Sequence, residues 1–256
     1  MTIVVAYKWA TNPQDAQVGA DGTVDLSRAK PAISEYDPIA IETGRRLADA
    51  TGAELVGLSV GGPDVASSMA RKASLSRGLD RLVLVSDPAL TGARAATTGA
   101  VLADQVRAIE GADLVLTGDG SVDEGAHLVP AVLAGRLGWP VLAEVTAVER
   151  TGDGRLRVTR SVGAGTEALE IDGPAVLSIA ADAVVPRVPG MKDILGAGKK
   201  PVEEVAGTLL VDVAEPQVVA RERPALAERK GRLIVGTDPA AAAAELVAAL
   251  RADGVL

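Results

Sequence analysis

Short apolar runs separated by amphipathic stretches constrain the fold of this chain most. These runs are too short for helices and lack the polar alternation of half-exposed strands, so each predicts a strand buried on both faces. They lie at residues 2–6, 54–60, 81–85, 112–116, 141–148 and 175–180. Helical patterns fill most of the intervals, at 39–52, 64–76, 88–110 and 126–138. Alternating strands and helices predict a doubly wound, mostly parallel α/β sheet with right-handed crossovers.

The stretch 112–140 is the first candidate for a binding site. A buried strand leads into a glycine- and acid-rich turn at 117–125, and a helix is expected from Ala126 to near Gly138. A strand, glycine turn and helix in this order present free backbone N–H groups at the carboxyl edge of a parallel sheet. Such turns also occur in α/β domains that bind nothing there, so that alternative stays open.

The N-terminal strand ends at the same edge and delivers Tyr7, Lys8 and Trp9 to it. Lys8 could bind a phosphate or a carboxylate, or it could be a solvated lysine. Residues 10–33 predict a small hairpin around Asp21-Gly22. In the helix that follows, Asp37 is expected as N-cap with Pro38 at the first position, so this helix N-terminus also faces the edge.

The last third of the chain has a different pattern of apolar and polar residues. Residues 155–161 and 166–171 alternate apolar and polar, which predicts an antiparallel hairpin at one edge of the sheet. The loop at 186–202 carries apolar residues among basic ones and is expected to be functional. We therefore predict an α/β domain over 1–204 and a C-terminal extension over 205–256 that packs on another subunit. That extension contains a short β-like run at 208–213, and we expect a strand at 232–235 and a helix at 240–252.

Composition excludes several classes of function. The net charge of −8 argues against nucleic-acid binding, which requires clustered Lys and Arg. With no cysteine and one histidine, a disulfide framework, a thiolate or multi-histidine metal centre and a nucleophile–base pair are not expected. Asp119, Asp123 and Glu124 could bind a cation, but acidic turns are usually solvated, so no metal site is predicted. A signal peptide and a membrane-spanning run are not evident, which predicts a cytoplasmic protein without membrane insertion.

Several stretches in the same order resemble the β subunit of electron transfer flavoprotein. The start VVAYKW is similar to the family's strand ending in Val-Ala-x-Lys, and residues 34–42 resemble its Asn-Pro-Phe-Asp-Glu-Ile-Ala helix start. Residues 119–130 occupy the place of its Gln-Ala-Ile-Asp loop. Residues 158–202 resemble its Glu-x-Leu signature followed by a protruding recognition loop, and residues 229–256 resemble its tail.

The resemblance implies a Rossmann-like, adenine-nucleotide-binding fold and a heterodimer. In this family the α subunit carries the redox-active FAD, and the β subunit binds AMP or, in bifurcating members, a second FAD. Electrons pass from flavin-dependent dehydrogenases to a downstream acceptor, so the protein is an electron carrier without catalytic residues of its own. The recognition loop at 186–202 would dock on the dehydrogenase through Met191, where the family has leucine, with Ile194 and Leu195 beside it.

The implied cofactor-binding residues lie at strand ends and in the loops that follow them. They are Ala6, Lys8, Ser34, Glu35, Tyr36, Asp37, Val60, Asp119, Gly120, Ser121, Val122, Asp123, Gly125, Ala126, His127, Leu128 and Val129. The chain departs from the family where the phosphate should bind, because Leu128-Val129-Pro130 replaces Gln-Thr-Gly. Pro130 lacks an N–H, Val129 lacks a hydroxyl, and Asp119 would repel a phosphate. Family members that bind FAD can also carry valine at the threonine position, so the resemblance implies that Val129 favours FAD or an empty site over AMP.

Alternatives remain for the function and for two residues. The chain could be a stand-alone adenine-nucleotide-binding module, or a docking subunit that has lost its nucleotide. His127 could bond a phosphate or flavin, but a solvent-facing histidine in the first helical turn is the preferred interpretation. Met191 could pack against the core of its own chain instead of docking on a partner.

Overall fold

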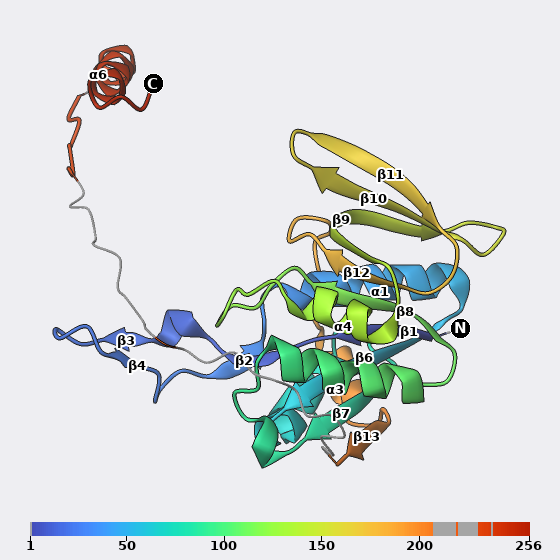
Figure 1. Cartoon of the computed structure of the whole chain (residues 1–256). Coiled ribbons are helices and arrows are strands. Elements are labelled where there is room, and N and C mark those ends of the chain that lie inside the picture. Colours follow the sequence, from blue (N-terminus) through green and yellow to red (C-terminus); the bar gives the residue numbers. More distant parts are fainter. Residues whose placement is uncertain (1, 207–218, 220–229, 237) are drawn as a thin grey trace. The chain divides into compact units, whose positions relative to one another are not determined.

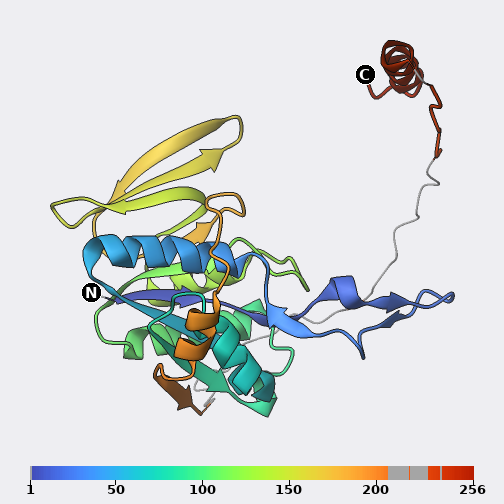
Figure 2. The ribbon, with the colours of Figure 1, turned by 180° about the vertical axis from the view of Figure 1, so that it is seen from behind.

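The computed structural model describes residues 2–206, 219, 230–236 and 238–256. It divides into two compact units, Met1–Glu215 and Pro216–Leu256. The first unit is built on one large sheet with helices on both faces (Figures 1 and 2). The described part of the second unit, residues 219, 230–236 and 238–256, includes the helix α6 (Pro239–Ala252).

The large sheet has nine strands in the order β11-β10-β9-β12-β8-β1-β6-β7-β13. From β1 the chain moves outward through β6 and β7, and then returns to the other side of β1 with β8. The topological switch point therefore lies between β1 and β8. The strands are β1 (Thr2–Ala6), β6 (Glu54–Gly61), β7 (Arg81–Ser86), β8 (Ala112–Gly118), β9 (Val141–Arg150), β10 (Leu156–Val162), β11 (Gly165–Ile171), β12 (Ala175–Ile179) and β13 (Val202–Val205).

All pairings from β9 through β12 and β8 to β13 are parallel, whereas β9–β10 and β10–β11 are antiparallel. The predicted doubly wound sheet and its edge hairpin are confirmed. Cross-strand ion pairs line the hairpin, with Arg160 Nε 2.7 Å from Glu167 Oε2 and Arg157 Nη2 3.1 Å from Glu170 Oε1. Such pairs suit a solvent-facing edge of a sheet.

Alternate residues of the central strands pack against different helices, which explains their uninterrupted apolar sequence. In β1, Ile3 and Val5 join a core cluster with α1 and α2, while Val4 and Ala6 join a second cluster with α3 and α4. Three layers result, with the sheet in the middle. The helices of this unit are α1 (Asp37–Thr51), α2 (Ser68–Leu75), α3 (Ala95–Ala108), α4 (Val129–Leu137) and α5 (Met191–Ala197).

Three helices begin later than the sequence predicts. The helix expected from Ala126 begins at Val129, because Gly125 and His127 have φ of 56° and 52°, outside the helical region. The helix expected from residue 88 begins at Ala95, after a 3₁₀ turn and Gly92 with φ of 70°. The one expected from residue 64 is a 3₁₀ turn and α2, which are separated by the extended residue Ser67.

The predicted N-cap of α1 is wrong. Tyr36 is the N-cap, and Asp37 is the first helical residue. Its carboxylate does not cap its own helix but accepts the backbone N–H of Lys8, at 2.7 Å from Oδ2. A long-range hydrogen bond has replaced the local one that the Asp-Pro pattern indicated.

The segment between β1 and α1 forms two small antiparallel ladders. β2 (Trp9–Thr11) pairs with β5 (Pro31–Ile33), and β3 (Gln17–Val18) pairs with β4 (Val24–Asp25). The predicted hairpin around Asp21-Gly22 is confirmed, with Gly22 at φ of 80° in its turn. This segment extends away from the large sheet (Figures 1 and 2).

The C-terminal unit differs in part from expectation. The predicted helix is confirmed as α6, and its N-cap Asp238 accepts the N–H of Ala240 at 3.0 Å. The strand predicted at 232–235 is wrong, because these residues are irregular and none of the described strands pairs with them. The apolar run at 208–213 lies outside the described residues.

Candidate functional site

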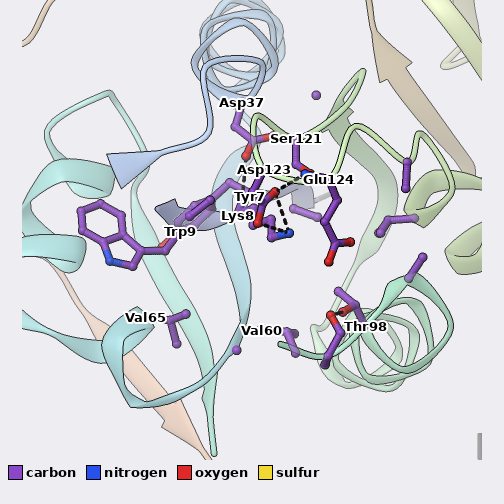
Figure 3. Close-up of a pocket in the computed structure, with 18 of the residues that line it drawn as sticks. Tyr7, Lys8, Trp9, Asp37, Val60, Val65, Thr98, Ser121, Asp123 and Glu124 are labelled. Carbon is purple, nitrogen blue, oxygen red and sulfur yellow. Dashed lines mark hydrogen bonds and ion pairs between the residues drawn. The ribbon is translucent and has the colours of Figure 1, made fainter. Parts of the chain in front are cut away.

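A cavity of about 330 Å³ opens at the carboxyl ends of the central parallel strands (Figure 3). This is the edge, at the switch point of the sheet, where ligands bind in open α/β folds. The structure brings twelve of the predicted cofactor-binding residues to its wall. They are Ala6, Lys8, Asp37, Val60, Asp119, Gly120, Ser121, Asp123, Ala126, His127, Leu128 and Val129.

The other five predicted residues lie behind or beside this wall. Ser34 connects two of its loops, because its N–H donates to the carbonyl of Lys8 at 2.9 Å and its Oγ accepts the N–H of Val122 at 3.3 Å. Gly125 donates its N–H to the carbonyl of Ser121 at 2.9 Å. Tyr36 caps α1, and Glu35 is exposed to solvent.

Asp37 is a buried ionisable group of the site with a strongly perturbed pKa. Its side chain is buried, and it accepts the backbone N–H groups of Lys8, two residues after β1, and of Gly118, at the end of β8. Burial raises the pKa of Asp37 to about 7, although both hydrogen bonds and the charge of Lys8 act in the opposite direction. Asp37 therefore ties α1 to the two strands at the switch point.

Lys8 forms an ion pair across the cavity floor, with Nζ 2.7 Å from Asp123 Oδ2 (Figure 3). Partial burial alone would raise the pKa of Asp123, but hydrogen bonds from Lys8 and Ser121 outweigh it and lower the pKa. Among the residues that the structure describes, Lys8 is the only lysine or arginine lining the cavity. The cavity's one cationic side chain is thus already paired.

His127 lies in the loop before α4, not in its first turn, and its side chain is half exposed. Its Nδ1 lies 2.6 Å from the carbonyl oxygen of Asp119. Since a carbonyl oxygen can only accept, Nδ1 carries the proton, and in the neutral ring Nε2 is an acceptor. The ring also covers Gly120, where a Cβ would lie 2.9 Å from Cε1 of His127.

The opposite wall was not predicted from the sequence. It comes from the segments after β6 and β7 and from the start of α3, and it contains small residues and hydroxyls. These residues are Gly61, Gly62, Pro63, Thr91, Gly92, Ala93, Ala95 and Thr98. The sequence could have indicated this wall only through the predicted topology, because β6 and β7 must end at the same edge as β1 in a doubly wound sheet.

Two observations concern metals and membranes. Within residues 2–206, 219, 230–236 and 238–256, there is no group of three or more His, Asp or Glu arranged to hold a metal ion. The helices of these residues include none that is long and apolar enough to cross a bilayer.

The residues from Arg187 to Lys200 form a second surface. We call this stretch the docking segment, after the role that the resemblance implies for it. The guanidinium of Arg187 binds Glu42 of α1, with Nε 2.6 Å from Oε2, and Lys200 Nζ donates to the carbonyl oxygen of Leu79 at 2.6 Å. Between these anchors, α5 leaves Met191, Ile194 and Leu195 with 72%, 44% and 69% of their surface exposed. The alternative that Met191 packs into its own core is therefore wrong.

Glu42→Gln should loosen the docking segment. Glu42 is only 7% exposed, and its carboxylate accepts hydrogen bonds from Arg187 and from Arg46 Nε at 3.0 Å. Losing the charge should lower the free energy of unfolding by about 2 kcal/mol. Amide hydrogen exchange in peptides covering 186–200 should become faster.

The matched control is Asp49→Asn, which removes an exposed carboxylate that pairs with Arg45 on the same helix. Because the Asp49 side chain is 63% exposed, this pair should be worth under about 1 kcal/mol. Equal effects of the two variants on exchange in 186–200 would show that Glu42 does not anchor the segment.

Comparison with known proteins agrees with this architecture. Residues 21–210 match the family model described as the electron transfer flavoprotein domain. The match includes most of the large sheet, the loop between β8 and α4, and the docking segment. The chain therefore belongs to the electron transfer flavoprotein domain family.

Proposed function

We propose that this chain is the β subunit of a heterodimeric electron transfer flavoprotein in the cytoplasm. It would relay electrons from flavin-dependent dehydrogenases to a downstream acceptor, with FAD held mainly by an α subunit. The observation that carries the proposal is a cavity, lined by both apolar and charged side chains, at the switch point of the sheet in a chain of this family. The exposed apolar docking segment supports a partner-binding role.

The bound flavin supplies the redox chemistry, and the residues of this chain serve to bind and to orient. Its cavity, at about 330 Å³, is at the small end of ligand pockets. That size supports AMP, or the adenylate half of a second FAD whose remaining part extends beyond the cavity. A docking subunit without nucleotide is the second candidate, because Val129 supplies no hydroxyl and Pro130 supplies no N–H at the start of α4.

The test is to co-express this chain with an electron transfer flavoprotein α subunit and to purify through a tag on this chain. Mass spectrometry and absorbance then identify the small molecules released on denaturation. One FAD and one AMP per heterodimer would support an electron transfer flavoprotein whose β subunit binds AMP. Two FAD per heterodimer would support the bifurcating type. One FAD alone would favour the docking subunit. Failure to recover any partner or flavin would overturn the electron-transfer proposal.

Replacing Met191, Ile194 and Leu195 together by alanine should impair docking without impairing folding. The three side chains are exposed, and alanine maintains the helix, so the melting temperature should change little. The rate at which the dehydrogenase reduces the flavin of the heterodimer should fall at least about tenfold, as expected when an apolar anchor is removed. Stopped-flow absorbance measures this rate.

Val162→Ala is the control, because it shortens an exposed apolar side chain on β10 instead. It should leave the rate of flavin reduction unchanged. If the triple variant is also reduced at the original rate, the docking segment is not the contact surface for the dehydrogenase.

A further inference from the structure

An internal carboxylate already occupies the anion-binding position of the cavity. Backbone N–H groups at strand ends beside a helix N-terminus are where a ligand phosphate would bind in this type of fold. Here the N–H groups of Lys8 and Gly118 both donate to Asp37. A phosphate at the switch point would have to displace a buried side chain of the protein itself.

Three N–H groups of the loop between β8 and α4 already have acceptors within the protein. The N–H of Val122 donates to Ser34 Oγ, that of Glu124 to Asp123 Oδ1 at 2.9 Å, and that of Gly125 to the Ser121 carbonyl. Pro130, in the first turn of α4, has no N–H. The Lys8 ammonium is held by both oxygens of Asp123, at 2.9 and 2.7 Å.

The same wall is rich in hydrogen-bond acceptors. Asp119, Asp123 and Glu124 line the cavity, and Figure 3 shows the carboxylate of Glu124 projecting from the loop. His127 adds Nε2 as an acceptor, because its Nδ1 proton is directed to the Asp119 carbonyl. Such a wall complements hydroxyl donors and repels a dianion.

We propose that the wall formed by the loop between β8 and α4 binds the ribose hydroxyls of an adenine nucleotide and excludes its phosphate. This inference rests on the proposed function, since it assigns the orientation of the ligand in the same cavity. Carboxylates that accept hydrogen bonds from ribose hydroxyls are a common solution in nucleotide-binding sheets. The phosphate end of the ligand then points away from Asp119 and Asp123.

Isothermal titration of the full chain with adenosine, AMP and 2′,3′-dideoxyadenosine tests this orientation. Adenosine and AMP should bind within about threefold of each other, because the phosphate gains no contact at this wall. The dideoxy compound should bind at least about tenfold more weakly, since the carboxylates lose their donors. AMP binding 100-fold tighter than adenosine, or equal binding of the dideoxy compound, would overturn the inference and leave the proposed function standing.

A variant provides a second test. Asp123→Asn removes one carboxylate of this wall, so adenosine and AMP should both bind about tenfold more weakly. Asp172→Asn, which alters the net charge equally at an exposed residue outside the cavity, should change neither. If none of the three compounds binds, the orientation is overturned, and the flavin content of the heterodimer decides the proposed function separately.

Discussion

Asp37→Ala is expected to lower the free energy of unfolding by about 3 kcal/mol at pH 5.5. At that pH the buried carboxyl is largely protonated, and its removal leaves the N–H groups of Lys8 and Gly118 without their acceptor. Each unsatisfied buried group costs about 1–3 kcal/mol. Urea denaturation monitored by circular dichroism measures the change. A loss below about 0.5 kcal/mol would show that water satisfies both groups.

The pH dependence of the Asp37→Asn variant separates the charge from the hydrogen bonds. Because the folded-state pKa is about 7 and the unfolded-state pKa is near 4, the folded protein binds the extra proton in this window. Stability due to Asp37 is greatest below the unfolded-state pKa and is lost as pH rises toward 7. The wild type should therefore lose about 2–3 kcal/mol relative to Asp37→Asn between pH 5 and 8. A difference that is constant with pH would contradict the raised pKa.

Gly118→Ala should destabilise the fold by about 2–4 kcal/mol. It tests how tightly Gly118 packs against the start of α1. A Cβ on Gly118 would lie 2.6 Å from Asp37 Oδ1 and 2.9 Å from the backbone carbonyl carbon of Tyr36. A backbone atom cannot yield as a flexible side chain does, so the start of α1 would have to move. Thermal unfolding measures the cost.

Gly135→Ala is the matched control for Gly118→Ala. Gly135 lies in α4, is exposed, and a Cβ there would meet nothing within 4 Å. Alanine in a helix interior should leave stability unchanged or raise it by up to about 1 kcal/mol. Equal losses in the two variants would mean that the contact between Gly118 and the start of α1 is not tight.

The strands were predictable because burial on both faces leaves a continuous apolar signature. The predicted runs 2–6 and 54–60 match β1 and β6 to within one residue at each end. Helix starts were less predictable, since they depend on single backbone conformations. His127 reads as a helical residue in the sequence, but its φ of 52° delays α4 to Val129.

The candidate site was predicted on one side only. Lys8 and the loop after β8 contain charges and glycines, which indicate chemistry in the sequence itself. The opposite wall consists of residues such as Thr91, Ala93 and Thr98, which become site residues only through the packing of α3 beside the strand ends. The role of Asp37 was mistaken for the same reason, because its partners are 29 residues away at Lys8 and on another strand at Gly118.

The two anchors of the docking segment have a consequence for its affinity. A free loop must lose backbone and side-chain freedom when a partner binds it, and that entropy is subtracted from the binding energy. Here Arg187 and Lys200 hold the ends of the segment to the domain before any partner arrives, and α5 already has its helical form. For the proposed docking on a dehydrogenase, most of the loss of conformational freedom would therefore occur during folding, and a small apolar contact would suffice for a complex that forms and separates quickly.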